Sequence, residues 1–106
     1  MSVEEMVDRC CDHALRFAEL LAREPGVRIV NEVELNQVLV RFERPGLDGD
    51  AWTREVIDRV QKDGTCWLSG TVWRGQALMR ISVCNWSTTA EDVQRSVEAI
   101  LAAHRA

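Results

Sequence analysis

Apolar residues recur every three or four positions in three segments of the chain. This spacing is the period of an amphipathic helix, which buries one stripe of its side chains. It predicts helices over residues 2–23, 50–62 and 88–103. The dipeptide Pro25-Gly26 is expected to end the first of them, because proline and glycine interrupt helical hydrogen bonding.

Polar residues with capping chemistry stand at the start of each predicted helix. Ser2 with Glu5, and Thr88 with Glu91, have the spacing of a capping box, in which each side chain binds the other residue's backbone N–H. Asp50 is expected to cap the second helix. The helical period and the capping residues therefore agree on where the three helices begin.

Four further segments are rich in β-branched and other apolar residues, which predicts strands. They cover residues 27–31, 35–42, 66–73 and 77–85. The last two are separated by Arg74-Gly75, which predicts a β-hairpin. The element order αββαββα indicates an α+β fold: a two-layer sandwich with an antiparallel sheet of about four strands and three helices on one face. We expect residues 1–106 to form a single domain.

Alternation along the strands assigns residues to the two faces of this sheet. In the last strand Ala77, Met79, Ile81 and Val83 form the apolar face, and Leu78, Arg80, Ser82 and Cys84 form the other. In the third strand Trp67 and Trp73 share one face, while Cys66, Leu68 and Val72 share the opposite one. Because both faces carry apolar groups, we expect the second face to be covered, most simply in a homo-oligomer. Core and interface roles both stay open for the tryptophans.

Charge and length exclude several classes of function. The chain has 106 residues and a formal net charge of −4, so nucleic acid and anionic membranes are poor partners. No apolar run is long enough to cross a bilayer, and the N-terminal segment does not resemble a signal peptide. The sequence therefore predicts a cytoplasmic protein.

The cysteines indicate buried thiols rather than a metal site. Cys10 and Cys11 are adjacent in a helical segment, and Cys66 and Cys84 lie in strand segments without a C-x-x-C pairing. Although Cys10 and His13 are one helical turn apart, a structural zinc site needs four convergent ligands. We expect reduced thiols and no metal.

Two basic residues are candidates for a role in a site. Lys62 is the only lysine, but it stands at the end of a predicted exposed helix, where a lysine complements the helix dipole. Arg80 lies on the strand face away from the core. A guanidinium binds a carboxylate through two parallel hydrogen bonds, which suits recognition of an amino acid. An ordinary solvated or ion-paired arginine is the alternative.

Three stretches resemble the C-terminal small domain of the pyridoxal-phosphate-dependent amino-acid decarboxylases of group II and fold type I. They are Asn36–Phe42, Trp67–Thr71 and Met79–Asn85. This family includes the glutamate, aromatic amino-acid and diaminobutyrate decarboxylases. The resemblance runs from about Val7 to Ile100, and Arg80 and Asn85 keep the spacing of the family's terminal strand.

The resemblance implies a part of an enzyme that is not catalytic alone. The large domain of the family carries the pyridoxal phosphate (PLP) on a lysine, and no counterpart of that domain is in this chain. We therefore expect no catalytic, cofactor-binding or metal residue here. The implied partners are the missing large domain and the amino-acid substrate, whose carboxylate Arg80 would bind. This domain would help to close the active site and position the substrate.

A free-standing protein is the alternative. In that case the chain would be a dimeric α+β module for small-molecule binding or assembly. The sequence leaves open whether the chain is a piece of a longer polypeptide or a natural short protein, and it does not identify a substrate.

Overall fold

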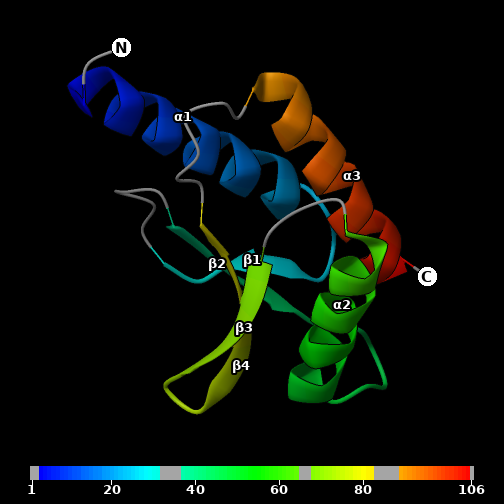
Figure 1. The fold of residues 1–106 in the computed structure, drawn as a ribbon. Coiled ribbons are helices and arrows are strands. Elements are labelled where there is room, and N and C mark those ends of the chain that lie inside the picture. Colours follow the sequence, from blue (N-terminus) through cyan, green and yellow to red (C-terminus); the bar gives the residue numbers. More distant parts are fainter. Residues whose placement is uncertain (1–2, 32–36, 65–67, 83–88, 106) are drawn as a thin grey trace.

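A computed structural model describes residues 3–31, 37–64, 68–82 and 89–105, and its elements follow the predicted order. Three helices cover one face of a four-stranded sheet (Figure 1). The elements are α1 (Val3–Ala22), β1 (Val27–Ile29), β2 (Gln37–Phe42), α2 (Gly49–Asp63), β3 (Leu68–Trp73), β4 (Gln76–Ser82) and α3 (Ala90–Arg105). The predicted α+β sandwich is thus confirmed.

The strands are antiparallel and lie in the order β1-β2-β4-β3, so β4 has a neighbour on each side. Beyond the end of β1, the Asn31 side chain continues the pairing with β2. Its carbonyl oxygen accepts from the backbone N–H of Leu39 at 2.9 Å, and its amide donates to the carbonyl of Gln37 at 3.0 Å. A side chain thereby replaces the last backbone pairs of the strand predicted over 27–31.

The core lies between the helices and the sheet face that alternation predicted. Val38, Val40 and Phe42 of β2 are completely buried, and Met79 and Ile81 of β4 are at most 2% exposed. They pack against one stripe from each helix, formed by Ala14, Phe17, Leu21, Trp52, Val56, Ile57, Val60, Val93, Val97 and Ile100. Burial of this continuous apolar surface is the main stabilising term of the fold.

The N-cap of helix α2 lies two residues earlier than the sequence suggested. Its N-cap is Asp48, whose carboxylate accepts the backbone N–H of Ala51 at 3.1 Å, so the expectation that Asp50 is the cap was wrong. Both aspartates have capping chemistry, but the carboxylate of Asp50 is engaged elsewhere, by Arg41 of β2 and the backbone of Ala77. At the other end Gly64 forms the C-cap with a φ of 74°, which favours glycine.

Helix α3 is capped by Thr89 and Asp92. The Thr89 hydroxyl accepts from the backbone N–H of Asp92 at 3.2 Å, and the Asp92 carboxylate accepts from the backbone N–H of Thr89 at 3.0 Å. This reciprocal pair has the geometry of a capping box and lies one residue after the predicted pair of Thr88 and Glu91. Thr88 and Ser2 both lie outside the described residues.

The predicted hairpin joins β3 and β4. Arg74 and Gly75 both have positive φ, 51° and 77°, as the two-residue turn with the right twist for a hairpin requires. The Arg74 guanidinium lies 4.4 Å from the ring centroid of Trp73. In the described part of the chain no helix has the length and apolar character needed to cross a bilayer.

Candidate functional site

Arg80 lies in the middle of the sheet on the face opposite the helices. Its cross-strand partners are Leu39 of β2 and Ser69 of β3, both half-buried. The Arg80 side chain is exposed, and no ion pair or side-chain hydrogen bond joins it to another described residue. The predicted orientation of Arg80, away from the core, is therefore confirmed.

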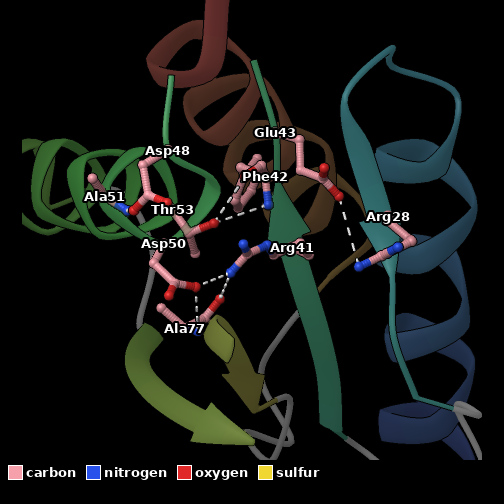
Figure 2. Close-up of polar contacts among 9 residues, drawn as sticks. All are labelled: Arg28, Arg41, Phe42, Glu43, Asp48, Asp50, Ala51, Thr53 and Ala77. Atoms are coloured by element: carbon pink, nitrogen blue, oxygen red, sulfur yellow. Dashed lines mark hydrogen bonds and ion pairs between the residues drawn. The ribbon is translucent and has the colours of Figure 1, made fainter. Parts of the chain in front are cut away.

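A second arginine on the same face has the opposite environment. Arg41 of β2 is only 8% exposed and forms an ion pair with Asp50 in the first turn of α2 (Figure 2). Its Nη1 also donates to the carbonyl oxygen of Ala77 at 3.0 Å. The backbone N–H of Ala77 in turn donates to the Asp50 carboxylate at 3.0 Å. These contacts tie the start of α2 to β2 and β4.

The electrostatics of this pair follow from the contacts. The hydrogen bond from Arg41 holds the pKa of Asp50 below its ordinary value, and the backbone N–H of Ala77 lowers the pKa further. The guanidinium packs directly against Gly49, because a β-carbon at that position would overlap Nη2 of Arg41. The fold thus supplies a carboxylate to Arg41, whereas it brings none of the described acids to Arg80.

The described part of the second face is less apolar than the sequence suggested. Leu78 is completely buried although it lies on the face away from the main core. If the pairing of β2 with β4 is continued by one residue, Leu78 lies opposite the buried Arg41. The rest of the described face is mostly polar, with Gln37, Ser69, Thr71, Gln76 and Ser82 beside Arg80. A broad apolar patch, which the apolar groups on both faces of the predicted strands suggested, is therefore not found among the described residues. Exposed apolar groups gather instead at the hairpin, where Val72 is 66% and Trp73 39% exposed.

The tryptophans divide between core and surface where they are described. Trp52 is 6% exposed and belongs to the core cluster, and Trp73 lies at the surface. Trp67 and Trp86, which the sequence left between core and interface, lie outside the described residues.

Lys62 is a surface residue, as predicted. Its side chain is 77% exposed, and Nζ lies 2.9 Å from the Asp58 carboxylate. The hydrogen bond that Lys62 donates to the Asp58 carboxylate, together with the negative charge of that carboxylate, raises the pKa of Lys62. An amine that attacks an aldehyde must be unprotonated, so a raised pKa is the opposite of what a Schiff-base lysine requires. Lys62 does not fit the role of a PLP-binding residue.

The described thiols give no sign of a metal centre. Cys10 is buried, Cys11 is half-buried, and both are free of disulfide bonds. No group of three or more potential ligands is found among the described residues, His13 included. Cys66 and Cys84 lie outside the described part.

A buried polar cluster that the sequence did not predict joins α2 to α3. The indole Nε1 of Trp52 donates to Nδ1 of His104 at 2.9 Å, and Nε2 of His104 lies 3.0 Å from the carbonyl oxygen of Pro25. Because Nδ1 accepts, Nε2 carries the proton and donates to Pro25. The signal in the sequence was the position of His104, four residues after Ile100 on the apolar stripe of α3.

Solved structures match this chain, whereas no family model and no curated protein sequence does. One match is a tryptophan decarboxylase of Catharanthus roseus in complex with L-tryptophan, with a TM-score of 0.89 and 17% identity over 95% of this chain and 22% of that one. The TDC of Oryza sativa, solved with PLP and tryptamine, matches with a TM-score of 0.88 and 20% identity, over 95% and 23%. The glutamate decarboxylase domain of a diaminobutyrate-pyruvate transaminase and L-2,4-diaminobutyrate decarboxylase from Vibrio parahaemolyticus gives a TM-score of 0.80 and 19% identity, over 95% and 22%.

The chain has the fold of one part of these proteins. It spans less than a quarter of the length of each of them. The resemblance that the three sequence motifs indicated is confirmed at the level of the fold. Sequence identities this low support a shared fold and no more.

Proposed function

We propose that this chain is the C-terminal small domain of a PLP-dependent amino-acid decarboxylase. In that enzyme it helps to close the active site and to position the substrate, and it is not catalytic alone. The observation that carries the proposal is the match of 95% of this chain to 22% of a tryptophan decarboxylase at a TM-score of 0.89. The missing large domain is the expected partner.

Arg80 would bind the α-carboxylate of the amino-acid substrate. The Arg80 side chain is exposed on the sheet face opposite the main core, and it has no acidic partner among the described residues. Arg41 gives the comparison. It lies two positions after Leu39, the β2 residue opposite Arg80, and the fold pairs its guanidinium with the Asp50 carboxylate. A guanidinium without such a partner is suited to a carboxylate that arrives from outside.

The cofactor would be held by the missing domain. The described residues offer no fit to PLP, because Lys62 is exposed and ion-paired and its pKa is raised. The contribution of this chain is therefore limited to binding and orientation. A carboxylate held in two parallel hydrogen bonds has a fixed orientation, which is the kind of positioning that lowers the entropic barrier of a reaction.

The test uses the complete polypeptide encoded with this chain. We expect it to decarboxylate at least one of L-tryptophan, L-glutamate and L-2,4-diaminobutyrate. Arg80→Ala should raise KM for that amino acid by about tenfold or more, since a hydrogen-bonded ion pair to substrate is lost. The absorbance of bound PLP should be unchanged. Steady-state kinetics and a PLP absorbance spectrum measure both.

Arg95→Ala is the matched control. Arg95 is an exposed arginine of α3 whose side chain is paired with Asp92, so its loss should change KM less than twofold. Equal KM values for the Arg80→Ala variant and the wild type would contradict the role of Arg80. If the coding sequence does not continue into a large domain, the free-standing module is the better hypothesis.

A further inference from the structure

The sheet face that carries Arg80 has a second hydrogen-bond donor directly beside it. Ser69 of β3 is the cross-strand partner of Arg80, and on the other side the partner is Leu39 of β2. Residues directly opposite each other in an antiparallel pair have their β-carbons about 5 Å apart and on the same face. The base of the Arg80 side chain is thus flanked by a hydroxyl on one side and an aliphatic group on the other.

The Ser69 hydroxyl is available for an external partner. It is half-buried, and no hydrogen bond joins it to another side chain of the described residues. Thr53 shows the contrasting case, because its hydroxyl donates to the carbonyl of Phe42 and accepts from the N–H of the same residue. Ser69 and Arg80 are therefore two neighbouring donors that the fold leaves unused in the described part.

We propose that Ser69 is a second substrate-binding residue, which donates a hydrogen bond to the carboxylate bound by Arg80. This inference rests on the proposed role of Arg80. A carboxylate has two oxygens with about four acceptor sites, and a guanidinium fork occupies only two of them. The serine on the β3 side can fill a third, while Leu39 offers none on the β2 side. The carboxylate is thereby drawn toward β3, and Leu39 faces the apolar part of the amino acid.

The test compares two β-branched replacements in the complete enzyme. Ser69→Thr keeps the hydroxyl, whereas Ser69→Val has nearly the same shape as threonine without it. We expect Ser69→Val to raise KM for the amino acid about tenfold, the usual effect of losing a hydrogen bond to a charged group. Ser69→Thr should stay within threefold of the wild type. kcat should not fall in either variant, because the carboxylate loses its negative charge as CO2 leaves and the hydrogen bond to it is weaker in the transition state than in the bound substrate.

Two further variants separate a binding role from a structural one. Ser82→Val, on the same face but opposite Gln37, should leave KM within twofold. In an Arg80→Ala background, Ser69→Val should raise KM no further, because the carboxylate is no longer held beside it. Ser69→Ala provides the same comparison without added methyl groups if the valine variant does not fold.

The outcomes distinguish this inference from the proposed function. If Arg80→Ala raises KM but Ser69→Val and Ser69→Thr give equal values, Ser69 does not bind the carboxylate and only this inference fails. If Arg80→Ala itself leaves KM unchanged, the proposed role of Arg80 fails, and the role of Ser69 with it.

Discussion

Two arginines on one sheet face show how local surroundings decide what a residue does. Arg41 is buried, ion-paired with Asp50 and bonded to a backbone carbonyl, whereas Arg80 is exposed and meets no acid in the described part. The Nε atom of Arg41 is buried without a hydrogen-bond partner in the described part. The ion pair with Asp50 is therefore the main compensation for burying this guanidinium.

Asp50→Asn should destabilise the fold, because the amide leaves a buried arginine without a negative charge beside it. We expect the melting temperature at pH 7 to fall by several degrees. Asp58→Asn removes an exposed acid of the same helix, which is paired with Lys62, and should shift the melting temperature by no more than about 2 °C. Thermal unfolding followed by circular dichroism measures both. Equal shifts would show that the Arg41 pair is energetically equivalent to a surface contact.

The Asp50→Asn variant also tests how the stability of the fold depends on pH. The pKa of Asp50 is lowered in the folded state, so its ionised form stabilises the fold at pH values above the unfolded pKa of about 3.9. This contribution is lost as the pH falls through the folded-state pKa. The difference in stability between wild type and Asp50→Asn should therefore be full at pH 7 and shrink below about pH 4.

At the scale of elements, the Trp52 and His104 side chains hold the end of α3 against α2 and the turn before β1. The indole donates to Nδ1, the ring donates to Pro25, and Arg59 of α2 donates to the carbonyl of Ala103 at 3.0 Å. The guanidinium groups of Arg44 and Arg59 lie 5.1 and 5.0 Å from the centroid of the Trp52 ring. The cluster is a structural joint between segments far apart in the sequence.

His104→Phe keeps an aromatic ring at this joint but removes the acceptor of the Trp52 N–H. An unsatisfied buried donor costs about 1–3 kcal/mol, and we expect the free energy of unfolding to fall by that amount. Adding Trp52→Phe should then cost less than the same change in the wild type, because the two residues interact. Urea unfolding of the four proteins of this cycle measures the coupling. Additive effects would contradict the bond.

At the scale of the whole molecule, the exposed large apolar residues of the described strands, Val72 and Trp73, lie at the hairpin rather than across the sheet. The turn of the β3–β4 hairpin points away from α1 and α3 (Figure 1). Val72 and Trp73 are exposed there, and the Arg74 guanidinium stacks on the indole ring. In a larger protein this end of the sheet is the natural place for a contact with another domain or subunit.

We predict that the isolated chain self-associates through this hairpin end, as expected for a homo-oligomer. Trp73→Glu should shift the chain toward monomer without loss of helical circular dichroism, since Trp73 is 39% exposed. Val3→Glu adds the same charge at another exposed apolar position, 72% exposed, and should leave the association unchanged. Sedimentation velocity over a range of concentrations is the measurement. A chain that stays monomeric throughout would contradict the prediction.

The sequence by itself determined the element order, the hairpin at Arg74-Gly75 and the two faces of the sheet. These are properties of short segments: a period of 3.6 or 2 residues, or a turn that needs positive φ, acts within a few positions. The same alternation put Met79 in the core and Arg80 on the open face. The motifs around them also pointed to the fold that solved structures share.

Only the tertiary structure decided how distant residues meet. Asp48 and Asp50 have the same chemistry, and Asp48 became the cap because Arg41, on another element, binds Asp50. Trp52 and His104 are 52 residues apart, and no local pattern pairs them. Ser69 and Arg80 lie opposite each other only because of the register in which β3 pairs with β4. Burial, ion pairing and shared sites depend on which elements pack together, and the chain assigns these partners only when it folds.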